Sequence, residues 1–443
     1  MAEIDRRTIQ DFGLDGQVLM ETAGRRVAQW LHDNLPRASR VLFLCGPGNN
    51  GGDGLVAARA WHDAGGHSDV YLPLPPSGQG DAQRNLLRAQ NWKLNFLERM
   101  PPHLEQYSQV VDALFGTGLS RNLSPQLSDQ LQGLPPCLAV DMPSGIHSDS
   151  GQVLGHALQA HTTITFGLPK TGQLLQPGAS YCGQLLVESI GFPRNLLESA
   201  EWPGQWLDDE LVRSLLPTRD YQTHKSNCGK VLVLAGSQQY PGAGILATQA
   251  CLRAGAGLVY TYAPHCVLDR LPVEAIPLTY GHGQNLGPDD LMPLLNHLDG
   301  MDALCVGPGL SLDPQGQQLI KQLLSRCSIP AVVDAGALPA LPDKLSPRIL
   351  LTPHHGELSR LLRSKVPDIE RDRLNFAIRG ARNFQCSLLL KGDPTLVATA
   401  GGSFLVSREG TPVLAQGGSG DVLSGIAAVS YTHLRAHETV LDL

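Results

Sequence analysis

The segment Gln416-Gly417-Gly418-Ser419-Gly420-Asp421-Val422-Leu423-Ser424-Gly425 decides how the second half of the chain is interpreted. A glycine-dense turn that leads into the apolar run Val422 to Val429 predicts a helix whose first N–H groups are unpaired and can bind an anion. The charge of Asp421 would repel that anion, so this carboxylate suits proton abstraction from a hydroxyl group. An ordinary turn with Asp421 as a helix cap explains this segment equally well when the segment is taken alone.

Length and composition limit the class of protein. A chain of 443 residues is too long for one ordinary core, so we expect two domains. Its nine cysteines occur singly, which favours the reducing cytoplasm over a disulfide framework. The charged start of the chain and the lack of a long apolar run predict no signal peptide and no membrane partner. A net charge of −7 argues against a nucleic-acid partner. We therefore expect a cytoplasmic homo-oligomer that acts on small molecules.

The first half of the chain has a strand that ends in a glycine-rich segment. Val41 to Cys45 is typical of a buried strand, and it runs into Gly46-Pro47-Gly48-Asn49-Asn50-Gly51-Gly52-Asp53-Gly54 and then a helix from Leu55 to Ala64. This is the first unit of a doubly wound α/β domain, whose ligand crevice lies at the carboxyl ends of the strands. The segment is neither GxGxxG nor a P-loop, so its oxygens could coordinate a hard cation or bind a sugar.

Two further strands have polar residues where they end. Val110 to Phe115 leads into Gly116-Thr117-Gly118-Leu119-Ser120-Arg121, and Cys137 to Asp141 leads into Met142-Pro143-Ser144-Gly145. The carboxyl ends of parallel strands meet at one crevice, so we expect Asn50, Asp112, Asp141 and Ser144 to be neighbours. The alternative is that each aspartate merely caps the helix that follows it.

The motifs GPGNNGGDG, VDALFGTGLSR and AVDMPSG together resemble the epimerase domain of the NAD(P)H-hydrate repair enzymes, over residues 1–200. The resemblance implies a Rossmann-like three-layer domain with Asp141 as its acid/base residue. It also implies a potassium site made of Asn50, Asp112 and Ser144. The residues that would bind the hydrated nucleotide are Asn49, Asn50, Gly51, Gly52, Asp53, Gly116, Thr117, Gly118, Leu119, Ser120, Arg121, Asn122 and Asp141.

Beyond a boundary at Gly191 to Pro217, which is rich in proline and charge, the strand pattern starts again. Val231 to Ala235 precedes a glycine-rich turn and a helix that runs to Ala256. Four more buried-strand patterns follow, separated by segments of helix length: Ala303 to Val306, Ala331 to Asp334, Ile349 to Thr352 and Ser387 to Leu390.

The exits of these strands, together with the GGSGD segment, resemble the ADP-dependent NAD(P)H-hydrate dehydratase domain, which has a ribokinase-like fold, over residues 205–429. The resemblance implies ADP as phosphoryl donor, Mg²⁺, and Asp421 as the catalytic base. The hydrate would contact Ala243, Gly309, His354 and Asp421. The adenine nucleotide would be held by Lys391, Gly392, Asp393, Pro394, Thr395 and Gly420. Two departures from the family pattern are His355, in place of a proline, and the pair Asp393-Pro394, in place of small residues. Taken alone, His354 is explained as well by a helix cap, and Lys391 by a solvated strand end.

An epimerase domain followed by a dehydratase domain matches the bifunctional repair enzymes, which are isomerase and lyase in one chain and act on hydrated NADH and NADPH. Two alternatives stay open. The second domain could be a simple small-molecule kinase, because a GxGD loop serves that chemistry equally well. The first could be a non-enzymatic binding module of Rossmann-like fold.

The last residues, 430–443, depart from the family pattern. After Val429 the helix loses its small apolar residues, and the string up to Thr439 resembles a translated sequencing adapter. We therefore expect a non-native tail and a dehydratase domain that is truncated at its C-terminal end.

Overall fold

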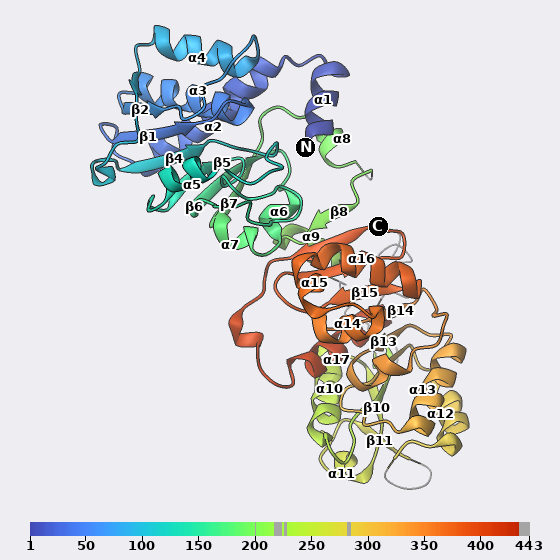
Figure 1. Cartoon of the computed structure of the whole chain (residues 1–443). Helices are drawn as coiled ribbons and strands as arrows, with labels where there is room; N and C mark the ends of the chain where they lie inside the picture. The colour runs from blue at the N-terminus through green and yellow to red at the C-terminus, as the bar shows by residue number, and fades with distance from the viewer. Residues whose placement is uncertain (200, 217–223, 226–227, 281–284, 434–443) are drawn as a thin grey trace. The chain divides into compact units, whose positions relative to one another are not determined.

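The computed structural model describes residues 1–199, 201–216, 224–225, 228–280 and 285–433. Its chain divides into two compact units, Met1–Ser199 and Ala200–Leu443 (Figure 1). Each unit is an α/β domain built on its own sheet. The predicted fold class, α/β with two domains, is confirmed.

The first unit has a seven-stranded sheet in the order β3-β2-β1-β4-β5-β6-β7, and all neighbouring strands are parallel. The strands are β1 (Arg40–Cys45), β2 (His67–Tyr71), β3 (Asn95–Leu97), β4 (Gln109–Ala113), β5 (Cys137–Val140), β6 (Ala160–Phe166) and β7 (Gln184–Glu188). The helices are α1 (Ala2–Gln10), α2 (Gly16–Asn34), α3 (Asn49–Asp63), α4 (Asp81–Asn91), α5 (Pro125–Leu131), α6 (Thr171–Leu174), α7 (Gly178–Cys182) and α8 (Arg194–Leu197). The chain order reverses between β1 and β4, and the crevice of a doubly wound sheet lies at such a reversal.

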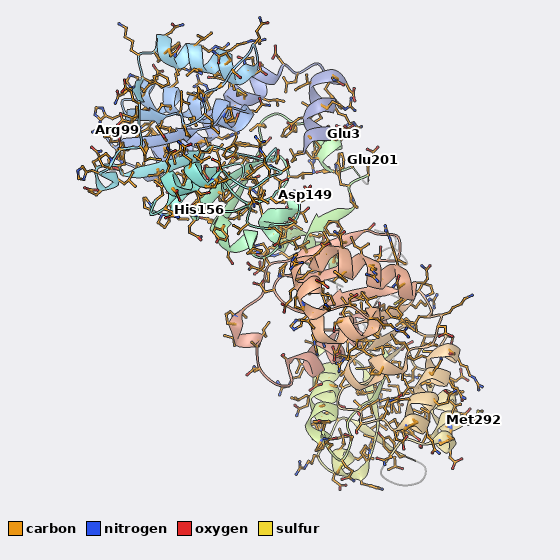
Figure 2. All side chains as sticks on the ribbon, viewed as in Figure 1. Glu3, Arg99, Asp149, His156, Glu201 and Met292 are labelled. Atoms are coloured by element: carbon orange, nitrogen blue, oxygen red, sulfur yellow. The ribbon has the colours of Figure 1, made fainter. Side chains whose placement is uncertain are left out.

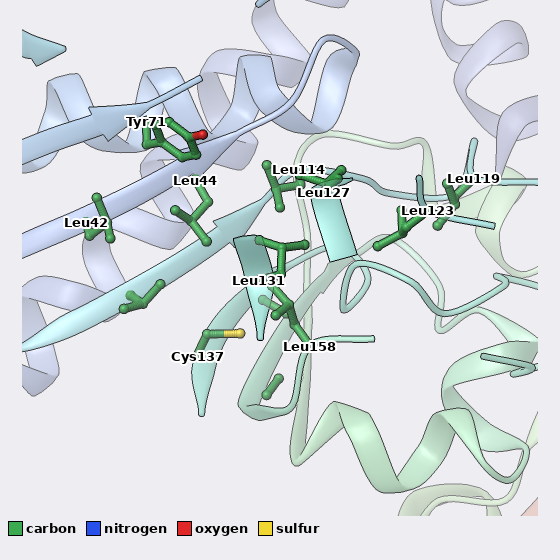
Figure 3. Close-up of a cluster of buried hydrophobic side chains, with 13 residues drawn as sticks. Leu42, Leu44, Tyr71, Leu114, Leu119, Leu123, Leu127, Leu131, Cys137 and Leu158 are labelled. Carbon is green, nitrogen blue, oxygen red and sulfur yellow. The ribbon is translucent and has the colours of Figure 1, made fainter. Parts of the chain in front are cut away.

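Helices cover both faces of this sheet. Successive side chains of a strand point to opposite faces, so a strand can contact helices on both sides. Leu42 and Leu44 of β1 belong to a buried cluster with Leu127 and Leu131 of α5 (Figure 3). Cys45, on the opposite face of β1, lies against Gly54 of α3. The unit is therefore a three-layer sandwich with α3 on one face and α5 on the other.

The helix after β1 begins earlier than the sequence predicts. We expected it from Leu55, but α3 begins at Asn49, and Gly51, Gly52 and Gly54 are buried in its first turns. These glycines let the helix pack against backbone, since a Cβ on Gly51 would lie 1.9 Å from the carbonyl oxygen of Gly46. They therefore serve close packing and do not form an open loop.

This close contact predicts that Gly51→Ala destabilises the first unit. Alanine is the better helix former by about 1 kcal/mol, but overpacking costs roughly 1–3 kcal/mol, and backbone cannot rotate out of the way. We expect a net loss of more than about 1 kcal/mol, measured by hydrogen exchange of peptides from residues 1–199. Gly118→Ala is the matched control, because a Cβ there meets nothing within 4 Å. Unchanged protection in Gly51→Ala would contradict the packing role.

The second unit has a ten-stranded sheet in the order β11-β10-β9-β12-β13-β14-β15-β16-β17-β8. Neighbours are parallel except where β16 pairs antiparallel with β15 and with β17. The strands are β8 (Gly204–Trp206), β9 (Lys230–Leu234), β10 (Leu258–Ala263), β11 (Ile276–Thr279), β12 (Ala303–Val306), β13 (Ala331–Val333), β14 (Ile349–Leu351), β15 (Ser387–Leu390), β16 (Thr395–Ala398) and β17 (Phe404–Ser407). The helices are α9 (Asp209–Leu215), α10 (Pro241–Ala254), α11 (His265–Leu268), α12 (Leu291–Leu298), α13 (Pro314–Arg326), α14 (His355–Leu362), α15 (Val366–Arg371), α16 (Arg373–Phe384) and α17 (Ser419–His433).

The helix that follows the GGSGD segment, α17, covers the centre of this sheet. Ala428 and Val429 are buried in a cluster with residues of β9, β12, β13 and α10. A Cβ on Gly425 would lie 2.4 Å from the carbonyl oxygen of Ala247, so α17 and α10 approach closely. The helix extends beyond the predicted Val429, and Tyr431 is also buried in the cluster. Residues 434–443, most of the expected tail, lie outside the described residues.

The predicted boundary segment contains regular structure. Within Gly191 to Pro217, β8 pairs in parallel with β17 and so belongs to the sheet of the second unit.

Charged side chains such as Glu3 and Arg99 project from the surface of the first unit (Figure 2). Among the described residues, no helix is long and apolar enough to cross a membrane.

Candidate active sites

The first unit has a cavity of about 570 Å³ beside the carboxyl ends of β1 and β4. The loops after β1 and β4 form one wall, and α1 and α2 form another. Of the predicted site residues, those that line it are Asn49, Asn50, Asp53, Gly116, Thr117, Gly118, Leu119 and Asp141. Gly51 and Gly52 are buried behind the wall, whereas Ser120, Arg121 and Asn122 are exposed farther along the loop. The structure thus brings most of the predicted substrate set to one cavity.

Two of the three predicted potassium ligands are in direct contact. Asp112 and Ser144 are fully buried, and Ser144 Oγ donates a hydrogen bond to Asp112 Oδ1 at 2.6 Å. The backbone N–H of Ser144 donates to Asp112 Oδ2 at 2.7 Å. Burial raises the pKa of Asp112 to about 6, although these hydrogen bonds oppose the change. Among the described residues, no cationic side chain is paired with this buried carboxylate.

The third predicted ligand, Asn50, lies at the wall of the cavity. Its side chain is 8% exposed, and neither its oxygen nor its nitrogen has a hydrogen-bond partner in the described structure. A Cβ placed on Gly116 would lie 3.3 Å from Asn50 Oδ1 and 3.2 Å from Asp141 Oδ2. The glycine therefore leaves room beside both side chains. An amide that is buried and unsatisfied needs a partner such as an ion, water or ligand.

Asp141 is held on both its backbone and its side chain. Its φ of +63° is in the left-handed region, which is uncommon for a residue with a side chain. Lys170 Nζ donates to Asp141 Oδ1 at 2.5 Å, and Thr165 Oγ1 donates to the same oxygen at 3.2 Å. The side-chain amide of Gln173 donates to the carbonyl oxygen of Asp141. A carboxylate fixed in this way inside a cavity is suited to proton transfer.

Sequence reasoning missed Lys170 and Gln173. Lys170 is 7% exposed, and its other two hydrogen bonds go to Thr165 Oγ1 at 2.7 Å and to the carbonyl oxygen of Phe166 at 3.2 Å. Gln173 is fully buried, and its oxygen accepts from the backbone N–H of Lys170. A single lysine after a strand gives no pattern that separates this buried position from a solvated one.

The centre of the second unit is an ion pair at the ends of β13 and β15. Lys391 Nζ donates to Asp334 Oδ1 at 2.7 Å, and Asp334 is 1% exposed. Ser424 of α17 donates from Oγ to the other oxygen, Asp334 Oδ2, also at 2.7 Å. Lys391 Nζ is 3.8 Å from Glu357 Oε2 as well. The predicted nucleotide lysine is therefore paired with two carboxylates and is not a solvated strand end.

The glycine segment lies beside this ion pair. A Cβ on Gly420 would be 3.5 Å from Lys391 Nζ and 3.9 Å from Asp334 Oδ2. Asp421, in the first turn of α17, is half-buried. Burial raises its pKa, the charge of Asp334 adds to this, and Lys391 opposes it. The structure therefore brings Asp421, Gly420 and Lys391 together, as predicted for a phosphoryl-transfer site.

His354 caps a helix. Its ring Nδ1 accepts from the backbone N–H of Gly356 at 3.0 Å at the start of α14, and Glu357 Oε2 accepts from the backbone N–H of His354 at 2.8 Å. The side chain is 49% exposed, and Nε2 is 3.5 Å from Glu357 Oε1. Ala243 and Gly309, the other predicted contacts of the hydrate, lie together, because a Cβ on Gly309 would come within 2.5 Å of Ala243 Cβ.

Arg373, which sequence reasoning also missed, holds the segment Lys391 to Thr395 through hydrogen bonds to its backbone. The guanidinium of Arg373 donates to the carbonyl oxygens of Lys391 at 3.2 Å and Pro394 at 3.0 Å. Thr395 Oγ1 donates to the carbonyl oxygen of Gly392 at 2.9 Å. Arg373 lies 18 residues before Lys391 in the sequence, so no local motif connects them.

Comparisons with known proteins match both halves of the chain to known families. Residues 16–172 match the family described as YjeF-related protein N-terminus, and residues 231–440 match the family described as NAD(P)H-hydrate dehydratase. A bifunctional NAD(P)H-hydrate repair enzyme Nnr from Moorella thermoacetica is 38% identical over 97% of this chain and 86% of its own length. The chain belongs to this family. The Nnr enzyme of Thermofilum pendens is 34% identical over 97% of this chain and 85% of its own.

Two solved structures resemble about half of this chain. An ADP/ATP-dependent NAD(P)H-hydrate dehydratase from Bacillus subtilis, co-crystallised with ATP and Mg²⁺, has a TM-score of 0.42 and 28% identity; the alignment covers 52% of this chain and 84% of that one. A ribokinase-like superfamily protein from Enterococcus faecalis has a TM-score of 0.46 and 26% identity, over 52% of this chain and 81% of that one.

Proposed function

We propose that this chain repairs hydrated NADH and NADPH, with an epimerase in residues 1–200 and an ADP-dependent dehydratase in the residues from 205 onward. The observation that carries the proposal is that each unit of this family member places a predicted catalytic carboxylate beside a lysine at the carboxyl edge of its sheet. Asp141 is paired with Lys170 in the first unit, and Asp421 lies beside Lys391 in the second.

In the first unit, Asp141 is the acid/base residue at the C6 oxygen of the hydrated ring. It exchanges a proton with the oxygen that leaves and returns, and the two C6 epimers interconvert. The glycine loop from Gly116 to Asn122 and the start of α3 hold the rest of the dinucleotide. The cavity volume of about 570 Å³ is within the range of small-molecule sites.

In the second unit, Asp421 takes the proton of the C6 hydroxyl, and the oxygen attacks the β-phosphorus of ADP, which leaves AMP. The N–H groups at the start of α17 stabilise the negative charge on the transferred phosphoryl group. The ring nitrogen then expels phosphate from C6, and loss of a proton from C5 restores the dihydronicotinamide. Lys391 to Thr395 and Gly420 hold the nucleotide, while Ala243, Gly309 and His354 hold the hydrate.

Product analysis separates repair from a small-molecule kinase, the other reaction that a GxGD loop supports. Purified protein with the S hydrate and ADP is expected to give AMP, phosphate and the reduced dinucleotide in equal amounts. A stable phosphate ester of the hydrate would support the kinase and contradict repair.

A potassium ion fits the buried oxygens of the first unit. Asn50 offers an amide that is buried and without a partner, and Asp112 offers a buried carboxylate beside the hydroxyl of Ser144. Carboxylate, amide and hydroxyl oxygens are ligands for hard cations. A bound cation would balance the negative charge of the Asp112 carboxylate, and it would hold the loops after β4 and β5 in place.

We therefore expect epimerase turnover to depend on the monovalent ion supplied. A cluster of oxygens selects by cavity size, so a bulky organic cation cannot replace potassium. Turnover is measured in buffers of equal ionic strength, with ADP-dependent repair by the second unit as the control reaction. Equal epimerase rates in potassium and in tetramethylammonium would rule out the site.

Mg²⁺ fits the second unit as a partner of the nucleotide. It commonly binds through one or two carboxylates together with substrate phosphates, and the carboxylates of Asp334 and Glu357 lie beside Lys391. Bound there, Mg²⁺ would neutralise charge on the phosphoryl groups.

We also propose that the protein is cytoplasmic and forms a homo-oligomer. All nine cysteines are free thiols, as expected in a reducing compartment. Several large apolar side chains are exposed, among them Met292, which projects from α12 (Figure 2).

A further inference from the structure

The cavity of the first unit is unusually acidic. Its lining contains Asp5, Asp53, Asp81 and Asp141, and the one cationic side chain in that lining, as far as the chain is described, is Lys170. Carboxylates would repel the phosphates of a dinucleotide but would stabilise a positive charge. This part of the cavity therefore suits the nicotinamide ring, at a stage of the reaction when the ring is cationic.

The carboxylates of Asp53 and Asp141 have opposite surroundings. Asp141 is ion-paired with Lys170 and accepts a second hydrogen bond from Thr165. Asp53, in the second turn of α3, has no hydrogen bond or ion pair to its side chain anywhere in the described residues. Burial raises the pKa of Asp53 well above that of an ordinary carboxyl group, and the charges of Asp141 and Asp5 raise it further, while Lys170 opposes them. Paired carboxyl groups whose environments differ in this way commonly divide the acid and base roles.

Other titratable groups face Asp53 across the cavity. Asp5 of α1 has a pKa raised by burial and then by Asp141, while Lys170 and the amino group of Met1 oppose this. Asp81 of α4 accepts a hydrogen bond from Gln17 at 2.9 Å and is 3.3 Å from Arg84, so it has polar partners of its own. The residues that α2 contributes to the lining have no titratable side chain; they are Gly16, Leu19, Met20 and Ala23.

We propose that Asp53 and Asp141 act as a proton-sharing pair, in which Asp53 protonates the hydroxyl that leaves C6 and Asp141 deprotonates the water that returns. This deepens the proposed epimerase function and rests on it. The C6–O bond breaks with its electrons on oxygen, water departs, and the lone pair of the ring nitrogen forms a planar cation with C6. A water molecule then adds to the other face of C6 and gives a proton to Asp141.

The reaction balances, because one proton leaves Asp53 and one proton reaches Asp141. Conversion in the opposite direction starts from the second state, with Asp141 protonated and Asp53 ionised. Between turnovers the proton returns through solvent or from one carboxyl group to the other. Both directions therefore need a pair that holds one proton, and Lys170 with the remaining carboxylates sets where that proton rests.

The proton-sharing pair is tested with three variants of the full chain, Asp53→Asn, Asp5→Asn and Asp81→Asn. Each is incubated with one purified epimer in H₂¹⁸O, without ADP. We expect the wild type to incorporate ¹⁸O at C6 with each inversion and to lose kcat/KM as pH rises through the pKa of Asp53. Asp53→Asn should lower kcat by about 10²–10⁴-fold and remove this loss at high pH, the alkaline limb of the pH profile. Asp53→Glu should restore part of the rate together with the limb. Asp5→Asn and Asp81→Asn should keep the limb, and hydrogen exchange of peptides from residues 1–199 reports on folding of the first unit in every variant.

Three results would overturn the pair: inversion without ¹⁸O incorporation, a limb that survives in Asp53→Asn, or a limb that is lost in Asp5→Asn instead. Each leaves the epimerase function standing, since the wild type still inverts C6. A wild type that does not invert C6 at all would refute the proposed function itself.

Discussion

We expect Asp421→Asn to lower the rate of ADP-dependent repair by about 10²–10⁴-fold, the usual contribution of a positioned base. Asparagine keeps the size of the side chain but cannot take the C6 hydroxyl proton. Nucleotide affinity should change little, because backbone N–H groups at the start of α17 and Lys391 hold the phosphates. Steady-state repair and calorimetric ADP binding measure the two effects separately.

The variant should also remain folded. Burial and the nearby Asp334 raise the pKa of Asp421, so the ionised form of this side chain is less stable in the folded state than in the unfolded chain. Removing that charge does not lower stability, and any loss of repair is then a loss of chemistry. In the wild type, repair should fall as pH falls through this raised pKa. If ADP affinity collapsed in Asp421→Asn, the residue would be structural and not the base.

The corresponding change in the first unit, Asp141→Asn, should lower the rate of epimerisation by a similar factor and leave repair of the S hydrate intact. The two sites belong to separate units. Asparagine tolerates the left-handed backbone at this position, where φ is +63°. The rate of epimerisation is followed by chromatographic separation of the two hydrates.

A second variant is needed to separate a loss of folding from a loss of chemistry, because Asp141→Asn leaves the buried Lys170 without its ion-pair partner. Removing one partner of a buried pair costs about 3–5 kcal/mol, whereas replacing both is often nearly neutral. We therefore expect the double variant Asp141→Asn with Lys170→Met to recover the protection of peptides 1–199 in hydrogen exchange without recovering epimerisation. An active double variant would show that Asp141 is not the acid/base residue.

Strand patterns predicted much of the fold because parallel strands that are covered on both faces are short and continuously apolar. Ala303 to Val306 and Ser387 to Leu390 agree with β12 and β15 residue for residue. β8 was missed because its three residues lie in a proline-rich segment and pair with a strand about two hundred residues later. The start of α3 was predicted late, since local propensity disfavours glycine in helices and only tertiary packing shows why Gly51 and Gly54 are there.

The sites were predictable where chemistry is local and unpredictable where it depends on partners distant in sequence. The strand-end rule predicted that Asp112 and Ser144 would be neighbours, and they share a hydrogen bond. It could not predict that Lys170 and Gln173 fix Asp141, or that Arg373 holds the segment after β15, because a buried cation has no local pattern. The resemblance to the repair enzymes did not identify these three residues either.

The central claim is that one chain carries both reactions, and a mixture of R and S hydrates tests it most directly. Without ADP, the purified protein should bring the two epimers to a constant ratio and form no reduced dinucleotide. With ADP, both epimers should be consumed and converted to NADH or NADPH, because epimerisation supplies the S form to the second unit. If the R hydrate remains unchanged while the S hydrate is repaired, or if ADP leads to no reduced dinucleotide, the account is contradicted.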